Sequence, residues 1–184
     1  MRNSVVTALF AASFATTCVA LPSAGDTILK NNIYDLIVPD KSPVKFDSWS
    51  GFDFAKFHGA FVLTGTFRYG HLSELDKTYD LIGLDFTPDE AVAATLPHWS
   101  GPLKLDSIAF DNPSDFIAAV IPVAAVDQIK QKKLLSVAGR ITIRVDQYAT
   151  FATCSTPVYR VRFVEVVKPA EAQVSQITAD ESGC

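Results

Sequence analysis

The chain has 184 residues, of which 48% are hydrophobic and 11% aromatic, enough for one domain with a buried core. Its 16 basic and 20 acidic residues give a net charge of −4 at pH 7. Because phosphate-dominated binding needs a surplus of Lys and Arg, this balance argues against a nucleic-acid binder.

The N-terminal segment 1–20 has the layout of a secretory signal peptide. Arg2 precedes an apolar run over Val5–Phe14, and Cys18-Val19-Ala20 places small residues just before a cleavage point at Leu21. A membrane-spanning helix takes about 20 residues, so a cleaved leader is favoured over an anchor. We therefore expect a secreted or periplasmic protein with no transmembrane anchor after cleavage. Loss of Arg2 takes the basic residues from 16 to 15 against 20 acidic ones, and the net charge from −4 to −5.

The mature chain keeps two of its cysteines, Cys154 and Cys184, because Cys18 leaves with the leader. In an oxidising compartment two cysteines predict one disulfide, which here would tie the polar C-terminal tail 169–184 to the domain. Closing a loop of about thirty residues contributes roughly 3 to 4 kcal/mol in the chain-entropy model. The alternatives are two unpaired thiols, or a bond between two chains.

Residues 21–57 show no long periodic segment. Pro22, Pro39, Pro43 and Gly51 interrupt short apolar pieces, which favours irregular structure. The segment is predicted to be an extended N-terminal arm packed on the domain, with at most a short strand or one helical turn. The arm carries four aromatic residues near its end: Trp49, Phe52, Phe54 and Phe57. We expect these rings to anchor the arm in the core, with a ligand-stacking surface as the alternative.

The clearest strand covers Gly59–Gly70, at the start of a domain predicted over 58–168. Apolar and polar residues alternate along it, as in a half-buried strand. The apolar phase consists of Phe61, Leu63, Phe67 and Tyr69. Gly65 lies in the same phase, and a glycine inside a strand weakens it unless it permits a bulge or a bend. This residue therefore predicts a curled sheet or a barrel.

Three further strands are predicted after it. Alternation over Ile82–Phe86 indicates the first. The second, Leu103–Phe110, changes its apolar phase near Asp106, so a bulge or a break is expected there. The third is the short apolar run Phe116–Ile121, which ends at a proline.

One helix is predicted, over Pro122–Ser136, because proline is favoured in a first helical turn and the apolar residues share one face. These residues are Val123, Val126, Ile129 and Leu134. Two alternating strands follow, Gly139–Tyr148 and Val158–Val167. Pro169 is expected to end the second.

The predicted fold class is mainly β with one helix. Strands, one helix and two closing strands are the element order of an OB-like β-barrel, in which the helix closes one end. The segment Gly59–Val167 resembles the barrels of small exported bacterial proteins of unassigned function, and the resemblance rests on element order alone. The extra strands between Leu103 and Ile121 exceed the five of an OB barrel, so the alternative is an α+β mixed sheet with one helix.

Several local signatures of catalysis are absent from the sequence, among them G-x-S-x-G, H-E-x-x-H, the P-loop, G-x-G-x-x-G and C-x-x-C. We expect an exported binding or structural module with no cofactor, whose partner is an anionic ligand or an envelope protein. The alternative is a hydrolase or lyase acting on envelope or environmental polymers. For that activity the first residues to test are His98, His71 and Asp85, since triads can assemble from distant positions.

No metal site is expected from the three histidines. His58 and His71 flank the long strand and lie far apart if it runs straight. A zinc site using His71, His98 and a carboxylate is the alternative.

Two groups of residues are candidates for ligand binding. Arg140, Arg144, Arg160 and Arg162 fall on the polar phase of two strands expected to be neighbours. Their rigid forks suit carboxylate or phosphate groups, so an anionic saccharide, a lipid head group or an acidic protein would bind there. The alternative is that they pair across the strands with acids such as Asp146 and Glu165.

Trp99 is the second candidate. It lies in a loop rich in Pro and Gly, Pro97–Pro102, and an exposed aromatic ring on such a loop stacks on sugars or peptides.

We predict that the exported protein begins near Leu21 and carries no free thiol. N-terminal sequencing and a non-reducing intact mass measure both properties. An intact Met1 or Arg2 would exclude cleavage, and thiols that react with alkylating reagent before reduction would exclude the disulfide.

Overall fold

A computed structural model describes most of the chain after residue 22. The described ranges are 23–31, 34–51, 53–71, 81–100, 105–152 and 157–175. For residues 171–175 the backbone alone is described. Within the described ranges the protein is mainly β, which confirms that part of the predicted class. The predicted signal peptide, Cys154 and Cys184 lie outside these ranges.

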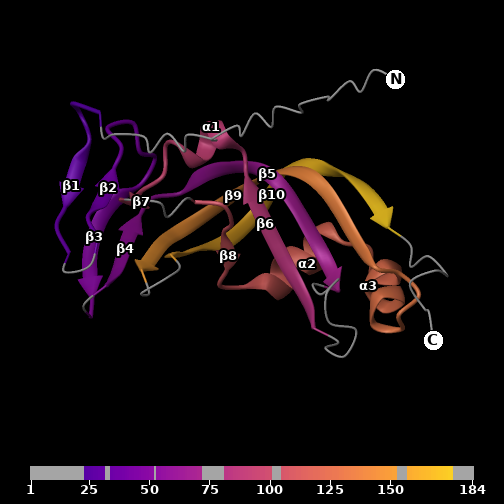
Figure 1. Ribbon diagram of the computed structural model, residues 1–184. Helices are drawn as coiled ribbons and strands as arrows, with labels where there is room; N and C mark the ends of the chain where they lie inside the picture. The colour runs from indigo at the N-terminus through magenta and orange to yellow at the C-terminus, as the bar shows by residue number, and fades with distance from the viewer. Residues whose placement is uncertain are drawn as a thin grey trace, which may run out of the picture.

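The described strands and helices follow one another in the order shown in Figure 1. The N-terminal elements are β1 (Thr27–Leu29), β2 (Leu36–Val38), β3 (Lys45–Ser50), β4 (Phe54–His58), β5 (Phe61–His71) and β6 (Ile82–Pro88). The later elements are α1 (Glu90–Ala93), β7 (His98–Trp99), β8 (Ala109–Phe110), α2 (Pro113–Val120), α3 (Val123–Lys130), β9 (Ser136–Ala152) and β10 (Pro157–Ser175).

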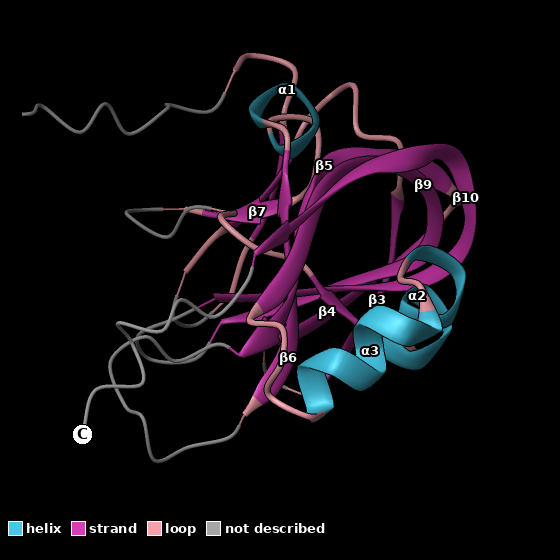
Figure 2. Cartoon of the chain, turned by 90° about the vertical axis from the view of Figure 1, so that its right-hand side faces the viewer, coloured by secondary structure: helices cyan, strands magenta, loops and turns pink. Residues whose placement is uncertain are grey.

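The larger sheet is built around β9. On one edge, β10 pairs with β9 along its whole length, from Pro157 opposite Ala152 to Ser175 opposite Ser136. On the other edge, β5 pairs with the first part of β9 and β4 with the last part. β6 then extends the sheet beyond β5, and β3 extends it beyond β4. Figure 2 shows the β9–β10 hairpin curling into an arch, with α2 and α3 at its open side.

Alternating residues explain the predicted strands that the structure confirms. β5, β6, β9 and β10 cover the segments where apolar and polar positions alternate, and their apolar phases form the core. Gly65 lies where β5 and β6 approach closely, since a Cβ there would be 2.3 Å from the Thr87 carbonyl oxygen. The glycine therefore permits this contact.

The N-terminal arm is more regular than predicted. Residues 21–57 were expected to hold one short strand at most, yet β1 and β2 pair with each other and β2 pairs with β7 in a separate three-stranded sheet. β3 and β4 form a hairpin that joins the larger sheet through β9. The prediction was wrong because the pairing partners of β2 and β4 are distant in sequence, and local breaker residues do not reveal them.

The predicted strands at 103–121 are largely wrong. Only Ala109–Phe110 forms a strand among the described residues of Leu103–Phe110, and Phe116–Ile121 belongs mostly to α2. The helix begins at Pro113, a residue favoured in the first helical turn, with Asp115 close behind. The Phe116 ring is fully buried, and its centroid lies 4.8 Å from that of Phe110. The expectation of a single helix is therefore also wrong.

The predicted helix at Pro122–Ser136 is confirmed as α3, although it ends at Lys130. Ile129 is buried as predicted, whereas Val123 at the start of the helix is 76% exposed. Pro169 does not end the last strand. β10 accommodates it in an irregularity between Lys168 and Glu171, the kind of position where proline is tolerated in a sheet.

The sheets are mainly antiparallel and open, and no closed barrel is found in the described part of the chain. The exception to the antiparallel pairing is β8, which runs parallel to β10 over two register pairs.

We predict that Gly65→Ala destabilises the protein by about 1 to 3 kcal/mol, because the added methyl group has no space beside β6. Urea unfolding of the two proteins measures the difference. The neighbouring exposed change Thr66→Ala is the control and should cost less than about 1 kcal/mol. Equal stability of Gly65→Ala and the wild type would contradict the close approach.

Candidate functional site

The four predicted arginines lie together on the outward side of β9 and β10, but each has an acidic partner. The ion pairs are Arg140–Asp89, Arg144–Glu165 at 2.8 Å, Arg160–Asp111 at 2.5 Å and Arg162–Asp146 at 2.6 Å. Two of them, Arg144–Glu165 and Arg162–Asp146, connect β9 with β10, as the alternative interpretation predicted. Four acids offset four arginines, so this stripe carries no surplus of positive charge.

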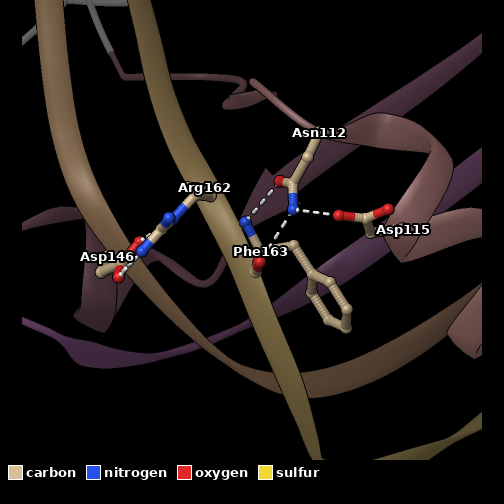
Figure 3. Close-up of polar contacts among 5 residues, drawn as sticks. All are labelled: Asn112, Asp115, Asp146, Arg162 and Phe163. Atoms are coloured by element: carbon tan, nitrogen blue, oxygen red, sulfur yellow. Dashed lines mark hydrogen bonds and ion pairs between the residues drawn. The ribbon is translucent and has the colours of Figure 1, made fainter.

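The Arg162–Asp146 pair has the strongest geometry. The guanidinium donates two hydrogen bonds, from Nε at 2.8 Å and from a terminal nitrogen at 2.6 Å, to the two oxygens of Asp146 (Figure 3). These bonds lower the pKa of Asp146 and raise that of Arg162. Both groups stay accessible to water, so the stabilisation is modest.

Asn112 fixes the edge of β10 next to this pair. Its Oδ1 accepts a hydrogen bond from the Phe163 N–H at 2.8 Å, and its Nδ2 donates to the Phe163 carbonyl at 2.9 Å. Figure 3 shows the amide occupying the place that a neighbouring strand would take. The same Nδ2 donates to Asp115 in the first turn of α2. The side chain therefore continues the pairing of β8 and positions the helix.

Trp99 does not offer an exposed ring. It lies in β7 and is 1% exposed, and its Nε1–H donates to Thr150 Oγ1 at 2.8 Å. The Tyr148 hydroxyl donates to the Pro97 carbonyl at 2.6 Å in the same region. Burial raises the pKa of Tyr148, and that of Tyr159 to about 12, and the Tyr159 hydroxyl accepts a hydrogen bond from the Trp99 N–H at 3.5 Å. The predicted exposure was wrong because a polar partner in β9 lets the indole enter the core.

The candidate residues for hydrolysis lie in different sheets. His71 and Asp85 belong to β5 and β6, whereas His98 belongs to β7. The His71 ring contacts the Ile129 carbonyl oxygen at 3.1 Å, and the His98 ring contacts the Leu96 carbonyl oxygen at 3.0 Å. Within the described ranges, no three His, Cys, Asp or Glu side chains form a group that could hold a metal ion.

The predicted disulfide stays a prediction, because both cysteines lie outside the described residues. The adjoining residues set a condition on it. Pro157 is at one end of the β9–β10 hairpin and Ser175 at the other. A bridge from Cys154 to Cys184 therefore requires the segment 176–184 to return along the hairpin.

The sequence analysis missed a second surface, on the outward side of β3, β4 and the end of β9. We call it the hairpin face and define it by Lys45, Phe54, Lys56, His58 and Phe151. In β4, Ala55 and Phe57 are buried, so the residues between and beside them point outward. Register pairing places Lys45 opposite His58 and Phe54 opposite Phe151.

The hairpin face carries two lysines and one acid beside them, Asp47, which is exposed in β3 and accepts a hydrogen bond from the Ser48 hydroxyl at 2.9 Å. Lys45 and Lys56 are exposed, and neither has an acidic partner within the described part of the chain. The Lys56 Nζ lies 5.9 Å from the centroid of the Phe54 ring. The Phe54 and Phe151 rings stack, with centroids 5.7 Å apart. In the sequence, the alternation over Phe54–His58 indicates this face, but only when it is known that Ala55 and Phe57 are the buried residues.

No family model, curated protein or solved structure matches the chain. None of the described helices is long and apolar enough to cross a membrane.

We predict that Asp146→Asn destabilises the protein by up to ~1 kcal/mol at pH 7, since the pair is partly exposed. The pKa of Asp146 is lowered in the folded state, so its contribution is present above the unfolded pKa of about 3.9 and is lost as the pH falls through the folded value. Urea unfolding between pH 7 and pH 3 should show the two proteins converging. Arg162→Gln should cause the same loss at pH 7; a difference that persists unchanged at acidic pH would contradict the ion-pair origin.

Proposed function

We propose that the chain is an exported binding module that takes an anionic ligand on the hairpin face. The observation that carries this proposal is the pair of exposed lysines, Lys45 and Lys56, with no ion-pair partner within the described ranges. In a chain with net charge −4, most positive charge is expected to be offset nearby, as it is for the four arginines. Exposed lysines outside ion pairs attract anions over a distance set by ionic strength, and the two lysines of this hairpin outnumber the exposed acid beside them, Asp47.

The position of the hairpin face also suits binding. β3 and β4 lie at the end of the molecule opposite α3 (Figure 1), so a bound ligand would not meet α2 or α3. Arg160 is the predicted arginine nearest to this face, because it pairs with Ala149, which in turn pairs with Lys56. We therefore propose the same class of ligand as the sequence analysis, an anion, but we propose that it contacts the lysines of the hairpin face instead of the arginines.

We further propose that β5, β6, β8, β9 and β10 form an incompletely closed OB-like barrel. Three features support this. The helices α2 and α3 fall between the third and fourth of these strands, and β8 runs parallel to β10. A backbone hydrogen bond of 2.9 Å, from the Ile108 N–H to the Phe86 carbonyl, links β6 to the segment that enters β8. In a closed barrel a ladder of backbone hydrogen bonds would join β6 to β8 at this position.

The alternative of a hydrolase or lyase has less support. The rings of His71 and His98 each contact a main-chain carbonyl oxygen, which engages one nitrogen of each imidazole in a structural contact. Secretion into the medium or periplasm remains part of the proposal and rests on the N-terminal leader.

We predict that the protein binds polyacrylate, a carboxylated polymer without sugar rings, at low ionic strength. Replacing Lys45 and Lys56 together with Gln should weaken binding about five- to tenfold, since each exposed charge contributes up to ~1 kcal/mol. Fluorescence titration or calorimetry measures the affinity. Lys133→Gln removes one positive charge from the turn after α3 and should bind like the wild type. Equal affinity of the double variant and the control would reject the hairpin face as the site.

A further inference from the structure

The aromatic pair on the hairpin face has no structural role in the core. Phe54 and Phe151 are register partners on β4 and β9, and their rings stack with an interplanar angle of 26°. Their chain neighbours Ala55 and Thr150 are fully buried, so the two rings point away from the core. Both rings are half-buried. Phe54 and Phe151 therefore form a small apolar patch between polar side chains on the outward side of the sheet. We call this patch the aromatic platform.

Lys56 lies beside this platform and can serve a ligand. Its ammonium group contacts the Phe54 ring from 5.9 Å, which is a weak interaction at an exposed site. A ligand carboxylate would form a stronger, charge-assisted contact with Lys56 and draw the ammonium away from the ring. The ring face would then be open to an apolar surface of the same ligand. One residue thus joins the charged part of the site to the aromatic part.

The spacing of the charged groups fits a chain with repeated acidic units. Lys56 and His58 are two residues apart on β4, a separation of about 7 Å, and Lys45 lies across from His58 on β3 at about 5 Å. Phe54 lies the same two residues from Lys56 on the other side. The aromatic platform and Lys56 therefore lie along β4, and Lys45 lies beyond them on β3, over a length that fits an oligomer.

We propose that the hairpin face binds a carboxylated saccharide chain, with one sugar ring on Phe54 and Phe151 and neighbouring carboxylates on Lys56 and Lys45. This inference rests on the proposed function and names its ligand class. The carbon-bound hydrogens of a pyranose ring present an apolar face that packs on aromatic rings, while the carboxylate supplies the charge. A ligand with only a sugar ring or only a carboxylate would contact the aromatic rings or the lysines, but not both.

A membrane surface is a poorer fit. Insertion into a bilayer needs projecting apolar side chains, whereas these two rings are half-buried. The large hydrophobic residues that are exposed in the described ranges lie elsewhere: Ile28, Val62, Leu81, Val123, Val164 and Val167. None of these belongs to β3 or β4.

The test compares a galacturonic acid oligomer with polyacrylate, using the full mature chain. Phe54→Leu keeps apolar volume but removes the ring face, and we expect it to weaken oligogalacturonate binding about five- to tenfold. Its affinity for polyacrylate should change less than about twofold, because the charges are intact. Lys56→Gln should weaken the binding of both ligands. Phe54→Tyr keeps the ring and should bind both like the wild type, which preserves the test if Phe54→Leu folds poorly.

The controls separate this inference from the proposed function. Val164→Ala removes an exposed apolar side chain from β10 and should leave both affinities unchanged. If the wild type binds polyacrylate but not oligogalacturonate, or if Phe54→Leu binds the oligomer normally, the saccharide inference is wrong and the anionic module stands. Binding of phosphatidylglycerol vesicles or polyglutamate in place of the oligomer would also overturn it. If the wild type binds none of these anions, both proposals are wrong.

Discussion

The pairing of β9 with its neighbours is the constraint on which the rest of the structure depends. β10, β5 and β4 all pair directly with β9, and each of the other strands in the larger sheet pairs with one of these three. The inward side chains of β9, among them Ile143 and Val145, are fully buried. The hairpin face at one end and the helical end at the other are therefore held in one framework. Disrupting β9 would affect both.

On the outward side of that framework, the arginines of the β9–β10 hairpin and the lysines of the β3–β4 hairpin differ in whether they form ion pairs. The four arginines of β9 and β10 form ion pairs, and the fork of Arg162 binds both oxygens of Asp146. The lysines of the β3–β4 hairpin, Lys45 and Lys56, have no such partner within the described ranges. A rigid guanidinium satisfied by a carboxylate favours a structural role. A flexible ammonium with nothing to bind is available for a ligand, which is why the proposed site lies on the lysines.

Sequence patterns predicted the elements whose determinants are local. β5, β6, β9 and β10 alternate over several residues, and α3 follows a proline with helical spacing. The pattern failed for α2, where the apolar run Phe116–Ile121 was too short to separate strand from helix and the start signal at Pro113 was overlooked. It also failed for β1–β4, because β2 and β4 join strands that are distant in sequence, β7 and β9.

The candidate site was harder to predict than the fold, because its members depend on long-range contacts. Trp99 follows a proline and a histidine and precedes a glycine-containing turn, which suggests exposure, but its partner Thr150 is 51 positions away. The arginines were placed correctly on the outer face, yet their charge is offset by Asp89 and Asp111 from outside the hairpin. No local pattern gives those partners.

The phase of β9 shows how a backbone detail determines the proposed site. Before the change Val137, Ile141, Ile143 and Val145 are buried, whereas beyond it the residues with 0% or 1% exposure are Tyr148, Thr150 and Ala152. The change occurs at Gln147, which has a left-handed φ of 53° and lies where two residues of β9, Gln147 and Tyr148, are opposite the single residue Val161 of β10. Without this extra residue Phe151 would point into the core. The aromatic platform therefore exists because the sheet contains a bulge, at the point where β9 changes its partner from β5 to β4.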